Sequence, residues 1–207
     1  MFALSADDLE GRILGCGDGP ASFNATATRR GHRVTSADPL YAYSAREIAA
    51  RITETAETVA EQTRRNAHEF VWRHFASVEQ LVAARMRAME EFLRDLPVGL
   101  SEGRYVDASL PELPFGDEAF DLALCSHCLF LYSEQHDLEF HVQSILELGR
   151  VARELRIFPL LELGSKPSRH LDEVVDRLES QGAEVRRVRV PYEFQRGGNE
   201  MLAVALR

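Results

Sequence analysis

The chain has 207 residues, of which 45% are hydrophobic and 28% are charged, and this composition indicates one globular domain that can carry a sizeable insertion. Its net charge of −9 argues against general binding of nucleic acid, which depends on Lys and Arg neutralising phosphates. No apolar run approaches the ~20 residues that a membrane span requires. We therefore expect neither nucleic acid nor a membrane as partner.

The N-terminus and the cysteines indicate a cellular compartment. The first residues include acidic side chains and no basic segment followed by an apolar one, so we expect no signal peptide. Three cysteines, an odd number, do not form a disulfide framework. Cys125 and Cys128 make a single C-x-x-C pair, and without a second ligand pair we expect no metal site. The sequence therefore predicts a protein of the reducing cytoplasm.

The first 38 residues have the pattern of a βαβ unit. A short apolar run at 12–14 breaks into the glycine-rich segment 15–20. A helical stretch over 21–30 follows, ended by Gly31, and the next strand stops at Asp38. Strand, glycine loop, helix, strand and acid thus follow one another within ~30 residues.

Residues 41–102 differ from what precedes and follows them. They show helical periodicity and almost no strand signal. Ser44 and Glu47 form a capping box at the start. We predict two or three helices over roughly 45–75 and 78–96, closed by Pro97 and Gly99. This segment is read as a helical insertion within a single domain spanning residues 1–207.

Strand patterns resume after the insertion, and the final two are read as an antiparallel pair joined by Gly197-Gly198. The predicted strands are 104–106, 120–126, 156–163, 184–192 and 201–206, and the predicted helices run from a cap at Ser133 to about 154 and over 168–181. This alternation predicts an α/β fold with a Rossmann-like, doubly wound, mostly parallel sheet and a C-terminal antiparallel strand pair.

Residues 13–38 resemble the cofactor-binding opening of the class I S-adenosylmethionine-dependent methyltransferases. In this alignment Gly17 and Gly19 match the two central glycines of the family, Ala21 matches the final small residue, and Gly31 and Asp38 follow at the family's spacing. Asp107-Ala108 and the strand that begins near Phe120 are similar to the family's second region, where a loop meets the adenine. The resemblance covers nearly the whole chain except the insertion.

The resemblance implies S-adenosylmethionine as cofactor, S-adenosylhomocysteine as product, and a site at the carboxyl ends of the strands. It implies that Asp38 accepts hydrogen bonds from the ribose hydroxyls and that Asp107, with the backbone of Ala108, meets the adenine edge. The implied cofactor-binding residues are Gly15, Cys16, Gly17, Gly19, Asp38, Pro39, Asp107, Ala108 and Ser126. The family's acid just before the first glycine is here Gly15, so cofactor binding is weakened unless another residue compensates.

His127 follows the fourth strand, where the family often places residues that face the methyl acceptor. It is a candidate general base or a contact to the acceptor, and a structural role for it stays open. Tyr132 and His136 are weaker candidates. The insertion leaves the carboxyl end of the second strand, which favours a lid over the site. Its residues His68, Trp72, His74 and Phe75 are candidates for acceptor contacts, with helix packing as the alternative.

The function expected on these grounds is methyl transfer to a small-molecule acceptor, and the sequence leaves the acceptor and the oligomeric state open. One alternative is a methyltransferase-like protein that binds the cofactor, or a partner, without catalysis; Gly15 is its main support. A nicotinamide dehydrogenase would need a glycine where Pro20 stands. A nucleoside-triphosphate enzyme would need a G-x-x-x-x-G-K loop, which the sequence lacks.

Overall fold

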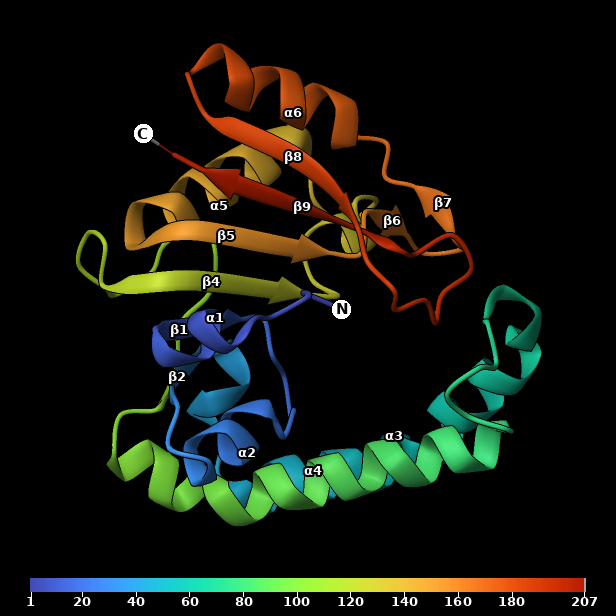
Figure 1. Cartoon of the computed structure of the whole chain (residues 1–207). Helices are drawn as coiled ribbons and strands as arrows, with labels where there is room; N and C mark the ends of the chain where they lie inside the picture. The colour runs from blue at the N-terminus through green and yellow to red at the C-terminus, as the bar shows by residue number, and fades with distance from the viewer. Residues whose placement is uncertain (207) are drawn as a thin grey trace.

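A computed structural model describes residues 1–206; Arg207, which the predicted domain includes, lies outside the described residues. A seven-stranded sheet in the order β3-β2-β1-β4-β5-β9-β8 forms the centre (Figure 1). The first five strands in this order are parallel, and β9 is antiparallel to both β5 and β8. The strands are β1 (Arg12–Cys16), β2 (Arg33–Ala37), β3 (Tyr105–Val106), β4 (Phe120–Ser126), β5 (Ala152–Phe158), β8 (Glu184–Arg189) and β9 (Glu200–Ala205). The predicted mostly parallel sheet with a C-terminal antiparallel pair is confirmed.

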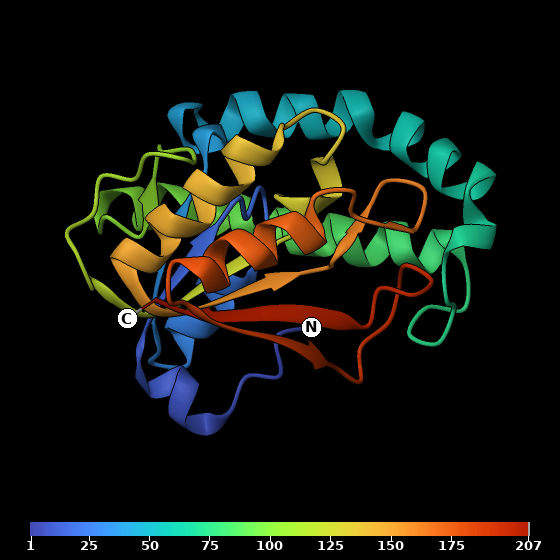
Figure 2. The ribbon, with the colours of Figure 1, turned by 90° about the horizontal axis from the view of Figure 1, so that it is seen from above.

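Helices cover both faces of the sheet, because the apolar runs in β1, β4 and β5 are buried on both sides. α5 (Leu138–Val151) and α6 (Leu171–Ser180) lie on one face, and α1 (Ala6–Glu10) lies on the other (Figure 2). α2 (Phe23–Arg29) contributes Ala27 to the cluster on the α1 face. A small antiparallel pair, β6 (Leu161–Glu162) with β7 (Lys166–Pro167), stands apart from the main sheet.

The predicted insertion is a long helical hairpin. A short 3-10 helix, η1 (Pro39–Ala42), leads into α3 (Ala45–Arg65), and η2 (Ala67–Glu69) precedes α4 (Val78–Ser101). The capping box of Ser44 and Glu47 is present at the start of α3. The hairpin runs beside the sheet, and its tip extends past the carboxyl ends of the strands (Figure 1).

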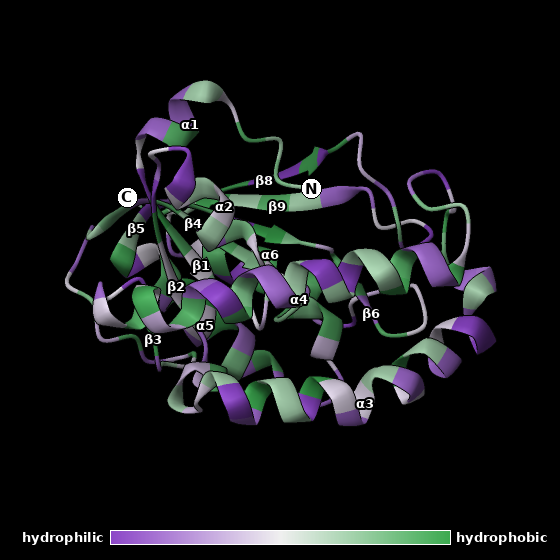
Figure 3. Ribbon diagram, turned by 90° about the horizontal axis from the view of Figure 1, so that it is seen from below, coloured by the Kyte–Doolittle hydropathy of each residue, from purple (hydrophilic) through white to green (hydrophobic). Residues whose placement is uncertain are grey.

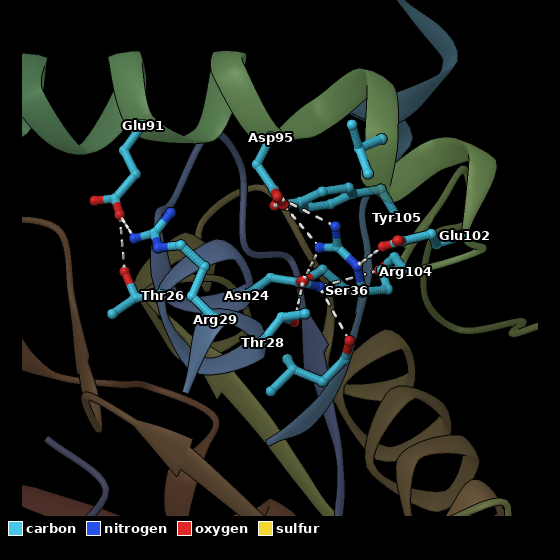
Figure 4. Close-up of polar contacts among 12 residues, drawn as sticks. Asn24, Thr26, Thr28, Arg29, Ser36, Glu91, Asp95, Glu102, Arg104 and Tyr105 are labelled. Carbon is cyan, nitrogen blue, oxygen red and sulfur yellow. Dashed lines mark hydrogen bonds and ion pairs between the residues drawn. The ribbon is translucent and has the colours of Figure 1, made fainter. Parts of the chain in front are cut away.

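The base of the hairpin is fixed to the core by polar contacts (Figure 4). Arg104, just before β3, pairs with Asp95 of α4 at 2.7 Å, and Arg104 Nη1 donates to Asn24 Oδ1 of α2 at 2.7 Å. The Tyr105 hydroxyl donates to the same Asp95 carboxylate at 2.8 Å. Glu91 also pairs with Arg29 of α2. These contacts join α2, β3 and α4 into one unit.

The tip of the hairpin is held at a second place, the loop between β8 and β9. The Val71 amide donates to Phe194 O at 2.7 Å, and the Arg196 amide donates to Glu69 O at 2.7 Å. The rings of Phe70 and Phe194 stack at 4.8 Å. The hairpin is therefore attached near both edges of the sheet, at β3 and at the β8–β9 loop.

Several predicted boundaries were wrong. Pro97 lies inside α4, which continues to Ser101 because Leu96 and Gly99 are buried at the base of the hairpin, where a Cβ at position 99 would overlap the Tyr105 ring. α5 begins after Asp137, whose side chain accepts from the Phe140 amide at 2.8 Å. The predicted cap, Ser133, instead closes the 3-10 turn η3 (Phe130–Tyr132).

The two elements that follow α5 also differ from their predicted bounds. α5 ends at Val151, so β5 starts at Ala152, four residues earlier than predicted. For the strand over 156–163, Pro159 predicts a bulge or an irregular end because its ring removes a backbone donor, and β5 does end at Phe158, with only Leu161–Glu162 continuing as β6. Among residues 1–206, no helix is both long and apolar enough to cross a membrane.

Candidate functional site

A cleft of about 1130 Å³ opens at the carboxyl ends of β1, β2 and β4. Its walls come from residues 1–4, the loop after β1, the end of β2, residues 108–110 and the segment after β4. Of the residues implicated by sequence, those that line it are Gly15, Cys16, Gly17, Gly19, Asp38, Pro39, Ala108, Ser126 and His127, together with the weaker candidates Tyr132 and His136. Asp107 is exposed and lies one position outside the lining.

The loop after β1 requires glycine at two positions. Gly17 and Gly19 have φ of 69° and 57°, the left-handed region that other residues rarely adopt. A Cβ at Gly17 would also lie 2.8 Å from Cys128 Sγ. The loop can therefore turn from strand to helix while its backbone borders the cleft.

Asp38 holds this loop in place from the end of β2. Its Oδ2 accepts from the Gly19 amide at 2.8 Å, and its Oδ1 accepts from the Leu40 amide at 2.8 Å. The buried Tyr41 hydroxyl donates to Gly19 O at 3.0 Å. Each carboxylate oxygen has a second lone pair, so Asp38 can still accept from a ligand in the cleft.

Asp18 also lines the cleft, and sequence reasoning missed it. Its carboxylate fills the space that a side chain at position 15 would take, because a Cβ on Gly15 would overlap it. Ser36 Oγ donates to Asp18 Oδ2 at 2.6 Å. Burial raises the pKa of Asp18 to about 6 against the effect of the Ser36 hydrogen bond, and the nearby Asp38 raises it further. A carboxylate from three residues later in the chain thus lies beside Gly15, the position at which the resemblance implied a missing acid.

His127 is presented at the cleft by an unusual backbone. It has φ of 53°, and its amide donates to Phe158 O at 2.7 Å. The ring Nδ1 lies 2.8 Å from Ser126 Oγ. Burial lowers the pKa of His127 to about 4, helped by the positive charges of Arg85 and of the N-terminal ammonium. The imidazole is therefore neutral at pH 7, with an unprotonated ring nitrogen, and it is a weaker base than a free histidine.

Residues 1–4 form a wall that sequence analysis left out, since it assigned no part of the pocket to the segment before β1. Arg156 of β5 donates to Phe2 O at 3.0 Å and pairs with Asp8 of α1 at 3.0 Å. The Phe2 ring meets Phe158 edge-on at 6.4 Å. The apolar residues Phe2 and Leu4 were the available signal for this packing.

The candidates in the insertion lie elsewhere. Trp72 and Phe75 pack against Phe194 at the hairpin tip, at 5.9 and 6.0 Å between ring centroids. His74 stacks on Tyr192 at 5.4 Å. Neither these residues nor His68 line the cleft, and none of its lining residues comes from the hairpin. Helix and loop packing accounts for the aromatic residues of this group.

The three cysteines lie close to the glycine loop. Cys16 and Cys125 are buried thiols, and Cys128 is half-buried in the cleft wall. A hydrogen bond between the Cys125 and Cys128 side chains lowers the pKa of Cys128 and raises that of Cys125. Within residues 1–206, no group of His, Cys, Asp and Glu side chains has the arrangement of a metal site.

Two solved structures share this architecture. Mitomycin 7-O-methyltransferase MmcR aligns with 99% of the chain at 14% identity and a TM-score of 0.51, and the chain spans 51% of its length. Magnesium protoporphyrin IX methyltransferase (ChlM) from Synechocystis PCC 6803, with bound SAH, aligns with 95% of the chain at 13% identity and a TM-score of 0.50, covering 74% of ChlM. The chain therefore has the fold of the class I S-adenosylmethionine-dependent methyltransferases.

At the level of sequence, no family model matches the chain. It belongs to the same family as the uncharacterized protein MJ0045 of Methanocaldococcus jannaschii, to which it is 30% identical over 205 residues. The match covers 99% of the chain and 90% of that protein.

Proposed function

We propose that the chain is an S-adenosylmethionine-dependent methyltransferase that binds its cofactor in the glycine-loop cleft and methylates a small molecule. The observation that carries the proposal is the pair of carboxylates, Asp18 and Asp38, that flank the left-handed glycine loop at the carboxyl ends of β1 and β2. The ChlM structure of the same fold holds SAH. Both support a cofactor made of an adenosine joined to an amino acid.

The residues of the cleft fit such a cofactor. Asp38 retains lone pairs for the ribose hydroxyls, and the backbone of Ala108 borders the cleft for the adenine edge. Asp18 offers a carboxylate to the ammonium of the amino acid end, the role for which position 15 lacks an acid. The adenine contact of Asp107 stays a prediction, because its side chain is exposed.

When bound, the cofactor supplies a methyl group already activated on a sulfonium, so the protein acts mainly by positioning and by excluding water. His127 is the residue that can move a proton. With its Nδ1–H donating to Ser126 Oγ, the Nε2 lone pair is available to take the proton from an acceptor hydroxyl or amine. Its lowered pKa keeps this nitrogen unprotonated at neutral pH.

The size of the cleft supports a small acceptor. Small-molecule pockets typically measure roughly 300–1,000 Å³, and this cleft measures about 1130 Å³, which leaves space beside the cofactor. The alternative of a binding or interaction protein without catalysis depended on the acid missing at Gly15. The Asp18 carboxylate meets that need and removes the main support for the alternative.

Transfer of labelled methyl groups tests this function. The protein is incubated with methyl-labelled S-adenosylmethionine and a protein-free extract of small metabolites, and label is sought in the extract after the cofactor is removed. We expect transfer by the unchanged protein and, at a limiting cofactor concentration, much less transfer by Asp38→Ala. If the protein binds the cofactor but transfers no label to any extract, the protein is a binding or interaction protein and the proposed methyltransferase activity is wrong.

A further inference from the structure

A second hollow lies between the two helices of the insertion. It measures about 230 Å³, and Pro20, the residue after Gly19, forms part of its wall. The groove therefore borders the loop that lines the cofactor cleft. Figure 3 shows apolar and polar residues interspersed along both helices. The apolar lining consists mainly of Ile48, Ile52, Val59, Val82, Met86 and Met89.

Arg85 of α4 places a positive charge in this apolar groove. Its side chain is solvent-exposed, and it makes no hydrogen bond or ion pair with any residue of the described chain. The other groove arginine, Arg51, is paired with Glu54 at 2.8 Å. Although Arg85 is exposed, desolvation by the surrounding protein lowers its pKa. Because Arg85 lines the hollow and is exposed, its guanidinium is open to a ligand there.

Two groups from other elements, Tyr192 and His127, lie close enough to Arg85 for its charge to shift their pKa values. Tyr192 lies in the β8–β9 loop, with its ring against His74 at 5.4 Å and Phe158 at 5.9 Å. Its hydroxyl, like Arg85, has no hydrogen-bond partner in residues 1–206. Burial raises the pKa of Tyr192, and the Arg85 charge opposes that rise. The charge of Arg85 also lowers the pKa of His127 in the cofactor cleft.

No carboxylate is among the groups whose charges act on Arg85 or on His127. Besides Arg85, the group that acts on His127 is the N-terminal ammonium, and Arg85 itself responds only to Tyr192. Arginine binds carboxylates and phosphates through two parallel hydrogen bonds, and an unpaired guanidinium beside an apolar wall favours an anion with an apolar body.

We propose that the methyl acceptor is a small amphiphilic anion, whose apolar part lies in the groove between α3 and α4 and whose carboxylate or phosphate binds Arg85 and the Tyr192 hydroxyl. The proposal rests on the proposed function, since it assigns the second substrate of that site. Anchored there, the molecule extends past Pro20 toward the glycine loop and His127.

Calorimetric titration tests this assignment with defined probes. Octanoate and octyl phosphate supply the two anionic heads, and 1-octanol supplies the neutral one, each with the protein saturated with S-adenosylhomocysteine. We expect at least one of the two anions to bind about ten-fold tighter than 1-octanol or more, and a ten-fold difference in affinity equals about 1.4 kcal/mol of binding free energy. Arg85→Gln removes this preference, and Tyr192→Phe, which keeps the ring stacking, reduces it. Arg87→Gln is the matched control, because Arg87 is exposed on the same helix and lines neither hollow.

His127 provides a second readout by NMR titration of its ring protons. Arg85→Gln raises the His127 pKa, since one of the nearby positive charges is lost, and a bound anion raises it in the unchanged protein by neutralising Arg85. Equal binding of anions and 1-octanol, or equal losses in Arg85→Gln and Arg87→Gln, overturns the inference while the proposed function stands. Light scattering checks whether a second copy of the chain covers the groove. If the protein is a dimer, Met86→Glu splits the dimer and no anion binds, the inference is also overturned. Failure of S-adenosylhomocysteine to bind overturns the proposed function, and the assignment of the anion as acceptor with it.

Discussion

At the scale of single residues, Gly15 and Asp18 depend on each other. The carboxylate of Asp18 turns back into the volume above Gly15, where it accepts the Ser36 hydroxyl. Only a residue without a side chain leaves that volume free. The space above Gly15 thus holds one carboxylate, that of Asp18, so a test of either position should change both residues.

The first prediction concerns the space that positions 15 and 18 share. Gly15→Asp forces two carboxylates into one buried space, and overpacking of this kind costs on the order of 1–3 kcal/mol before the charge repulsion is counted. We expect the melting temperature to fall by roughly 2–4 °C per kcal/mol in a chain of this size. The double variant Gly15→Asp with Asp18→Gly should recover most of the loss. Unchanged melting in the single variant would mean that the two positions do not share a space.

The second prediction concerns pH. The Asp18 pKa of about 6 lies above the usual value for aspartate because of burial, and only the ionised carboxylate attracts the cofactor's ammonium. Binding of S-adenosylhomocysteine should therefore weaken as pH falls below about 6, approaching ten-fold per unit. Adenosine, which lacks the ammonium, should show no such dependence, and Asp18→Asn should abolish it. A dependence that persists in Asp18→Asn assigns it to another group.

The same pKa has a consequence for folding. An aspartate whose pKa is raised on folding contributes stability in its protonated form, fully present below about pH 4 and lost as pH rises through about 6. In the absence of ligand, Asp18→Asn should therefore gain stability relative to the unchanged protein at pH 7 but not at pH 4. Urea unfolding at the two pH values measures the difference, and an equal effect at both contradicts the raised pKa.

Part of the lining of the candidate site was predictable residue by residue. Gly17, Gly19 and Asp38 follow from local spacing, because a strand, a tight turn and a helix fix where each lies relative to the sheet edge. Asp18 was not identified, since its role depends on the empty volume at Gly15 and on the Ser36 hydroxyl of the neighbouring strand. Spacing along the chain contains no information about either.

At the scale of elements, the hairpin is the part whose role most needs testing. It is joined to α2 and β3 at its base and to the β8–β9 loop at its tip. Between these attachments the groove is open. The predicted role as a lid stays a prediction, because the hairpin supplies none of the residues that line the cofactor cleft.

Hydrogen exchange tests the lid. If the hairpin closes over bound ligand, exchange across residues 44–96 should slow with S-adenosylhomocysteine, and it should slow more than exchange in β8 and β9. Asp38→Ala, which we expect to bind the ligand more weakly, should show less slowing at a ligand concentration that half-saturates the unchanged protein, and it serves as the control. Full protection without ligand, and indifference to it, would make the hairpin a structural or oligomerisation element.

The base of the hairpin gives a prediction about stability. Arg104 and Asp95 have side chains only 13% and 17% exposed, and removing a charged partner from such a largely desolvated hydrogen bond costs about 1.5–3 kcal/mol. Glu102 pairs with the same arginine but is 52% exposed, so its loss should cost less than about 1 kcal/mol. Urea unfolding of Asp95→Ala and Glu102→Ala compares them. Equal effects would contradict a buried anchor at Asp95.

At the scale of the whole molecule, the fold was predictable because it is encoded by apolar runs and their order. Buried strands such as β4 are continuous apolar segments, and short connections leave few alternative topologies. The start of α5 was less predictable from the sequence. Ser133 and Asp137 are both good caps, and tertiary contacts select between them. The closure of the cleft by residues 1–4 depends on Arg156, a contact made across most of the chain.

The central claim is that the cleft at β1, β2 and β4 is a site for S-adenosylmethionine. Calorimetric titration of the unchanged protein with S-adenosylhomocysteine, with NAD as comparator and Asp38→Ala as control, tests it most directly. We predict one site per chain for S-adenosylhomocysteine, no measurable binding of NAD, and an affinity weakened at least about ten-fold in Asp38→Ala, since a hydrogen bond to a charged acceptor contributes about 1.5–3 kcal/mol. No binding of S-adenosylhomocysteine, or equal binding by the unchanged protein and Asp38→Ala, would contradict the account.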